Sequence, residues 1–190
     1  MTIRLIRGDL LDSDAEAIAL TIDGAGPGLE GGVARAFAKR FPEAWAAVES
    51  QIQYPIPLGD ADAFPIEEDT ARERLVILAS TLHHTESFSE NDKRAVVRDA
   101  FRNALESAAI HRKKSLAAAI FSGGWRLSSS QAMNEMVNTY LRLAMHKTLP
   151  DLHVHVIEDE EADRLGEFFD QLHYLTVEKT SSGFVIERKA

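Results

Sequence analysis

Gly24-Ala25-Gly26-Pro27-Gly28-Leu29-Glu30-Gly31-Gly32-Val33 places five glycines within nine residues, between an apolar run and a helical pattern. The apolar run, residues 17–22, is typical of a buried strand, whereas Val33, Phe37 and Phe41 recur every four residues as on a helix. Glycine lets a ligand approach the main chain, and a helix start offers unpaired N–H groups and partial positive charge. The order strand, glycine loop, helix therefore predicts an anion site, most often for phosphate; a glycine-rich surface loop without a ligand is the alternative.

A second stretch repeats this order. Residues 115–121 read as a buried strand, Ser122-Gly123-Gly124-Trp125-Arg126 as a glycine turn, and a helical pattern opened by Ser128 follows. In an open α/β sheet, two such loops meet at the carboxyl ends of the strands, where ligands usually bind. Neither loop is a phosphate-binding P-loop, because Gly-Lys-Ser/Thr is absent, and Gly24, Gly26 and Gly31 do not fit the dinucleotide spacing G-x-G-x-x-G.

Strands and helices alternate along the whole chain. We predict strands at 3–6, 15–22, 60–66, 75–79, 115–121 and 152–157. Helices are predicted at 32–40, 96–108, 132–144 and 158–171, and another begins at Pro42. Ser89 and Asp92, three residues apart, give a helix-start signal before the stripe at 96–108. A polar turn is expected at 67–74, and residues 174–178 and 184–188 alternate around a Ser-Ser-Gly turn as in a hairpin. The sequence predicts an α/β fold in three layers (α/β/α), with a small C-terminal β-hairpin as an appendage.

Composition and charge narrow the class of protein. The 190 residues are 45% apolar and 27% charged, which indicates one globular domain. The absence of cysteine excludes disulfides, thiol nucleophiles and cysteine–zinc sites. The net charge of −9 opposes binding to nucleic acid and to anionic membranes. No apolar run approaches the roughly 20 residues that cross a bilayer, and the first residues do not read as a signal peptide, so we expect a cytoplasmic protein.

Histidines and serines are the remaining candidates for chemistry. His153 and His155 share one face of a strand, either as a metal pair without an evident third ligand or as a polar strand face. His83 and His84 follow a strand near the expected ligand end, where they contact substrate or act as a general base, or simply belong to a loop. Ser122 precedes its glycines and is not in G-x-S-x-G, so no serine triad is argued. No catalytic residue, metal or cofactor is assigned.

Six short segments, taken in order, match the motifs of one known family. They are Arg7-Gly8-Asp9-Leu10, Gly31-Gly32-Val33-Ala34-Arg35-Ala36-Phe37, Pro57-Leu58-Gly59-Asp60-Ala61, residues 75–79, Ala119-Ile120-Phe121-Ser122-Gly123-Gly124-Trp125 and Val156-Ile157-Glu158-Asp159-Glu160. Together they resemble the macro domain, the fold that binds ADP-ribose. The resemblance covers roughly residues 2–170 and predicts a single macro-like domain over 1–190, with a core at 2–171, a mixed sheet and a hairpin extension at 172–190.

The resemblance implies a ligand, ADP-ribose or a related adenosine diphosphate compound, and a role for each matching residue. Asp9 would accept from the adenine amino group beside the Leu10 main chain; the alternative is that Asp9 caps a turn. Gly31, Gly32 and Val33 would face the diphosphate and distal ribose. Ser122, Gly123, Gly124 and Trp125 would wrap the diphosphate from the other side. Captured by backbone dipoles, a diphosphate needs no metal.

The chain departs from the family pattern before the first glycine loop. Leu20-Thr21-Ile22-Asp23 stands where the family has Asn-Ala-Ala-Asn, and Glu30 replaces a glycine. Asp23 can still bind ribose hydroxyls, but Asp23 and Glu30 add negative charge, which Arg126 would offset. The resemblance implies hydrolysis of ADP-ribosyl derivatives if the protein is an enzyme. The alternative is a diverged structural or interaction module that has lost nucleotide binding, its protein partner unknown.

Overall fold

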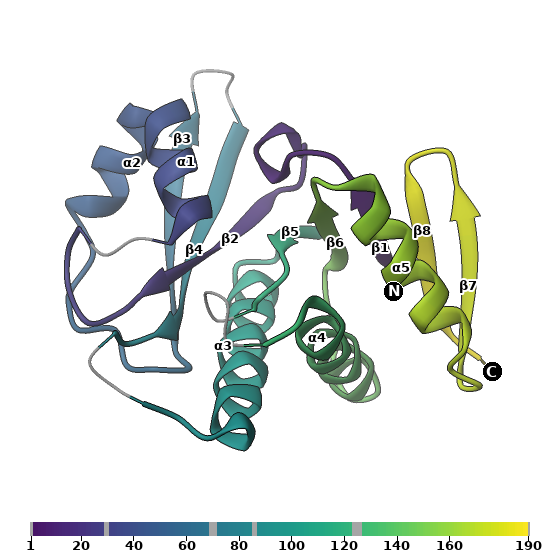
Figure 1. Cartoon of the computed structure of the whole chain (residues 1–190). Coiled ribbons are helices and arrows are strands. Elements are labelled where there is room, and N and C mark those ends of the chain that lie inside the picture. The colour runs from purple at the N-terminus through teal and green to yellow at the C-terminus, as the bar shows by residue number, and fades with distance from the viewer. Residues whose placement is uncertain (1, 29–30, 69–71, 85–86, 123–126, 190) are drawn as a thin grey trace.

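The computed structural model describes residues 2–28, 31–68, 72–84, 87–122 and 127–189. Its elements alternate as the sequence predicts (Figure 1). In chain order they are β1 (Ile3–Arg7), η1 (Leu10–Asp12), β2 (Ala17–Asp23), α1 (Gly32–Arg40), α2 (Pro42–Glu49), β3 (Ala61–Glu68), β4 (Arg72–Leu82), α3 (Glu90–Ile110), β5 (Ser115–Ala119), α4 (Ser129–Ala144), β6 (Asp151–Val156), α5 (Asp159–Asp170), β7 (Leu175–Thr180) and β8 (Gly183–Arg188).

The strands form one mixed sheet of eight, in the order β3-β4-β2-β5-β6-β1-β8-β7. The five central strands, from β4 to β1, run parallel. The outer pairs are antiparallel, β3 against β4 on one side and β8 against β1 on the other. The middle strands β2 and β5 are mostly apolar, as expected of parallel strands buried on both faces. Strands β1 and β6 instead alternate apolar with polar residues, among them Arg4, His153 and His155.

Helices cover the two faces of the sheet unequally. Helices α3, α4 and α5 pack on one face and close the larger of two hydrophobic cores, where Phe101 meets Phe121 edge to face. Helices α1 and α2 pack on the other face over β2 and β3 (Figure 1). They bury Phe37 and Trp45 in the smaller core. On this second face, the short helix η1 lies against β5 and β6. The predicted three-layer α/β/α architecture is confirmed.

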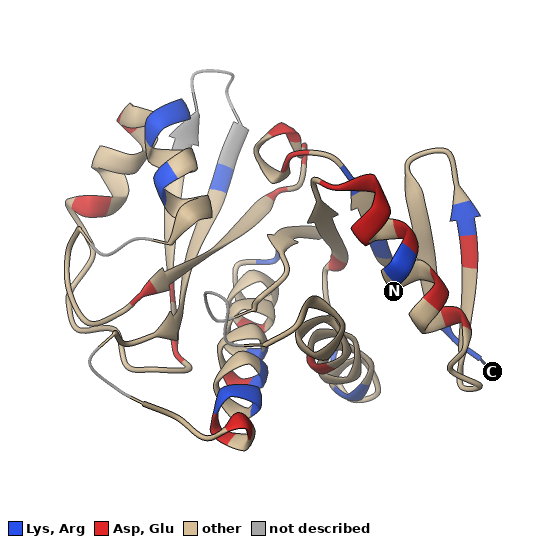
Figure 2. Ribbon diagram, viewed as in Figure 1, with Lys and Arg blue, Asp and Glu red and all other residues tan. Residues whose placement is uncertain are grey.

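Side-chain caps fix where the helices of the larger core begin. Ser89 and Asp92 form a reciprocal capping box at the start of α3, as their spacing predicts. Ser128 and Gln131 do the same at the start of α4. Helix α5 begins with three acidic residues, Asp159, Glu160 and Glu161, which complement the helix dipole and appear together in Figure 2.

Two predictions at strand level need correction. The turn expected at residues 67–74 is too long, because β3 continues to Glu68 and β4 begins at Arg72; residues 69–71 lie outside the described part of the chain. The C-terminal hairpin forms as predicted, but it is not a separate appendage, since β8 pairs with β1 and extends the main sheet. Gly183 makes that pairing tight: its φ is +147°, and a Cβ there would lie 1.9 Å from the Leu5 carbonyl oxygen.

No helix in the described ranges is both long enough and apolar enough to cross a membrane.

Candidate functional site

The parallel strands bring the sequence-predicted residues to one edge of the sheet. Asp9 follows β1, Asp23 ends β2 and Ser122 follows β5. Because β1, β2 and β5 run in the same direction, these positions lie at the carboxyl-terminal edge, where open α/β sheets bind ligands. The loops that follow these strands, although far apart in the sequence, therefore begin at the same edge of the sheet.

Helix α1 begins at this edge without a side-chain cap. Its N-cap is Gly31, which makes no side-chain cap bond, and the first turn of the helix carries no acidic residue. The two glycines differ in their surroundings. A Cβ on Gly31 would lie 2.7 Å from the Thr21 carbonyl oxygen, so glycine is needed there to pack α1 against β2. A Cβ on Gly32 would meet no described residue within 4 Å, so the described part of the chain leaves space beside this residue. Val33, next along, is half-buried against the smaller core.

Asp23 holds the turn after β2. Its side chain is 5% exposed, and its two oxygens accept from the main-chain N–H of Ala25 (3.0 Å) and of His84 (3.0 Å). The Nδ1 atom of the His84 ring lies 3.1 Å from Asp23 Oδ2. Since a carboxylate only accepts, the neutral form of the His84 ring has its proton on Nδ1 and presents Nε2 as an acceptor, on a side chain that is 53% exposed.

This pairing joins two residues that the sequence does not connect. The sequence marks His84 as a candidate base and Asp23 as a ribose contact, but they lie 61 residues apart. Strand β2 pairs in parallel with β4, and this pairing brings the ends of the two strands together. Neighbouring His83 serves the fold, because its Nε2 lies 3.0 Å from the Ile56 carbonyl oxygen.

Asp9 and Leu10 lie at the start of η1. Asp9 Oδ1 accepts from the main-chain N–H of Leu11 (2.9 Å), which is the capping role that the sequence left open. Its other oxygen, Oδ2, is 3.8 Å from a guanidinium nitrogen of Arg40, which also pairs with Asp12. The Leu10 side chain is buried in the smaller core, so only its main chain remains for a ligand. The adenine-binding role of Asp9 stays a prediction.

The second glycine loop is described only in part. The N–H of Ser122 donates to the Ile120 carbonyl (2.8 Å), and its own carbonyl accepts from Leu127 (3.1 Å). Gly123, Gly124, Trp125 and Arg126 lie outside the described residues, as does Glu30 of the first loop. Their predicted contacts with the diphosphate stay predictions.

His153 and His155 are not part of the candidate site at the carboxyl-terminal edge of the sheet. They lie side by side with Arg4 and Ile6 on the sheet face that η1 partly covers. Among the described residues, no three His, Cys, Asp or Glu side chains are grouped so as to hold a metal ion.

Solved structures with the macrodomain fold are similar to this chain. The macrodomain of Thermus aquaticus DarG matches with a TM-score of 0.59 at 20% identity and covers 81% of this chain and 97% of its own. An Oceanobacillus iheyensis macrodomain with ADP has a TM-score of 0.64 at 16% identity, over 88% of this chain and 93% of its own. A mutant Oceanobacillus iheyensis macrodomain with ADPR has a TM-score of 0.61 at 14% identity, over 88% and 95%.

The chain therefore has the macrodomain fold, in the diverged form that the six short segments predict. At these identities the likeness concerns the fold. No protein-family model and no curated protein matches the sequence.

Proposed function

We propose that the chain binds ADP-ribose or a related adenosine diphosphate compound at the carboxyl-terminal edge of its sheet. The observation that carries the proposal is the start of α1, where uncapped N–H groups and the open main chain of Gly32 suit a diphosphate. The macrodomain fold supports it, because solved structures of that fold hold ADP and ADPR. Asp9, Leu10, Asp23, Val33 and the second glycine loop complete the proposed site.

Calorimetric titration tests the proposal. ADP-ribose is the ligand, with AMP and ribose 5-phosphate as controls. Gly32→Glu places a carboxylate in the first turn of α1, so we expect it to weaken ADP-ribose binding by about tenfold or more. Ala36→Glu is the matched control, since it adds the same charge at an exposed position of the same helix and should leave affinity nearly unchanged. Equal affinity for AMP and ADP-ribose would mean that the distal-ribose half of the site is lost.

Hydrolysis of an ADP-ribosyl conjugate is the second candidate function, and the Asp23–His84 pair is the observation that favours it. In this reaction water donates its proton to His84 Nε2 and its oxygen bonds to the anomeric carbon of the distal ribose. The bond from that carbon to the conjugated carboxylate breaks, and the carboxylate leaves with the electron pair. Asp23 acts as a positioning residue, because it holds the ring through Nδ1.

An ADP-ribosyl-glutamate peptide is the substrate that tests hydrolysis. We expect His84→Gln to abolish turnover while ADP-ribose binding persists. Turnover that survives His84→Gln removes His84 from the mechanism, and no turnover by the native chain leaves binding alone. If calorimetry and thermal shift detect no binding of any of the three ligands, the alternative of a structural or interaction module is favoured.

A further inference from the structure

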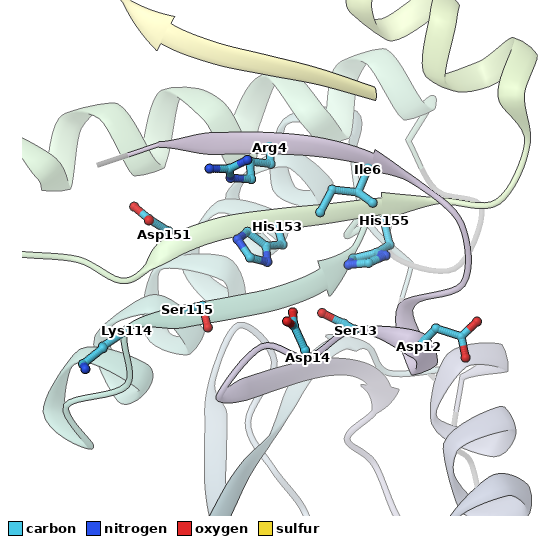
Figure 3. A pocket seen from close by; sticks show the side chains of 10 residues that line it. All are labelled: Arg4, Ile6, Asp12, Ser13, Asp14, Lys114, Ser115, Asp151, His153 and His155. Atoms are coloured by element: carbon cyan, nitrogen blue, oxygen red, sulfur yellow. The ribbon is translucent and has the colours of Figure 1, made fainter. Parts of the chain in front are cut away.

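A cavity of about 480 Å³ lies on the same sheet face as α1 and α2, over the strands β1 and β6, which these helices do not cover (Figure 3). Its floor is formed by neighbouring strands: His153 and His155 of β6 pair in register with Arg4 and Ile6 of β1. The η1–β2 connection forms the opposite wall with Ser13 and Asp14. The cavity is open to solvent along one side, and its volume is within the range of small-molecule sites. The cavity is separate from the loops that follow β2 and β5, and the inference from it does not rest on the proposed function.

His155 is the buried polar group of this cavity. Its side chain is 9% exposed, its ring is directed into the cavity in Figure 3, and neither ring nitrogen has a hydrogen-bond partner among the described residues. Burial lowers the pKa of His155, and neighbouring His153 lowers it further, against smaller opposite effects of Asp9 and Asp12. A neutral imidazole offers one donor and one acceptor, so His155 can accept from a ligand donor or donate to a ligand acceptor.

The two walls carry opposite charges. Arg4 is exposed on one wall and Asp14 on the other, with the two imidazoles between them (Figure 3). Neither Arg4 nor Asp14 forms an ion pair with a described residue, whereas Asp12 pairs with Arg40. Two further charges line the rim, Lys114 and Asp151, and the Asp151 carboxylate accepts from the Thr2 main chain (3.1 Å).

We propose that this cavity binds a small zwitterion of the amino-acid class, with its carboxylate on Arg4 and its ammonium group on Asp14. The imidazole of His155 accepts from the ammonium group or donates to the carboxylate. A simple anion is disfavoured, because Asp14 repels it. A simple cation is disfavoured by Arg4, and a metal ion also lacks a third grouped ligand among the described residues.

The test is calorimetry on the full chain with glycine, β-alanine and 4-aminobutyrate, which separate the two charges by one further methylene or two. Butyrate and butylamine carry only one charge each. We expect one of the three zwitterions to bind at least about tenfold more tightly than either single-charge compound, because a hydrogen bond to a charged group is lost in each.

Variants assign the binding to this cavity. Arg4→Gln and Asp14→Asn should each weaken the bound zwitterion about tenfold. The same changes at exposed residues outside the cavity, Arg188→Gln and Asp170→Asn, should have no effect. In nitrogen-15 spectra of the imidazoles, the ligand should shift the signals of His155 and leave those of His173 in place.

Three results would overturn the proposal. The first is that none of the three zwitterions binds. The second is that butyrate binds as well as 4-aminobutyrate and Asp14→Asn tightens both, which defines an anion site. The third is that a zwitterion binds but His155 signals do not move, which places the ligand elsewhere.

Discussion

Replacing Asp23 by alanine tests whether this one carboxylate fixes the turn at the candidate edge. The substitution removes two main-chain hydrogen bonds, each 3.0 Å long, and the 3.1 Å contact with the His84 ring. A hydrogen bond to a charged group contributes about 1.5 kcal/mol at the low end, and the exposed ring adds about 0.5 kcal/mol. We therefore expect a loss of about 3–4 kcal/mol in the free energy of unfolding, or a fall in Tm of about 6–16 °C for a domain of this size.

Urea unfolding and a thermal scan measure this loss. Asp12→Ala is the matched control, because it removes the same side chain from an exposed ion pair with Arg40, and surface pairs contribute about 0–1 kcal/mol. If Asp23→Ala unfolds at the same urea concentration as Asp12→Ala, the carboxylate does not fix the turn, and the argument that it positions His84 fails with it.

Three further predictions concern the sheet and the cavity. Gly183→Ala should cost at least about 2 kcal/mol in urea unfolding, because its Cβ would lie 1.9 Å from a main-chain oxygen, whereas Gly32→Ala, in open space, should cost less than about 1 kcal/mol. Tyr140→Phe should cost about 1–1.5 kcal/mol, since the buried hydroxyl donates to the Pro150 carbonyl (3.0 Å). Burial lowers the pKa of His155, so as the pH falls below 6.5, the ordinary pKa of histidine, the unfolded chain binds a proton before the folded chain does. The free energy of unfolding should therefore fall from pH 7 to 5, and it should fall less steeply in His155→Phe.

Local signals predict most of the fold. Apolar runs mark the central strands, a period of four residues marks α1, and Ser89 with Asp92 marks the start of α3. The facing ends of β3 and β4 are not predicted, because residues 67–68 and 72–74 are polar and show no alternation of apolar side chains. Their main chains nevertheless pair, as Glu68 does with Arg72. The pairing of β8 with β1 is equally hidden, since alternation predicts a hairpin but not its neighbour.

The sequence predicts where in the fold the candidate site lies better than it predicts which side chains contact one another there. Strand order decides which loops meet, and the sequence predicts the meeting of the loops after β2 and β5 from their common direction. It does not predict that Asp23 turns toward His84, because no spacing rule links residues 61 positions apart. The sequence does not predict the cavity beside His155 either, because its walls come from β1, β6 and the η1–β2 connection, which are far apart in the chain.

The orientation of Asp23 changes how its charge weighs against diphosphate binding. A carboxylate that faced the diphosphate would repel it. From the sequence alone, Asp23 therefore favours the alternative of a structural or interaction module that has lost nucleotide binding. In the structure both oxygens are occupied by N–H groups of Ala25 and His84, and the side chain is almost wholly buried. Those dipoles offset part of the charge, and His84 becomes the exposed group at this position. The choice between a nucleotide-binding protein and a structural module therefore depends less on Asp23 than on the start of α1. Comparing ADP-ribose binding by Gly32→Glu and by Ala36→Glu distinguishes the two alternatives.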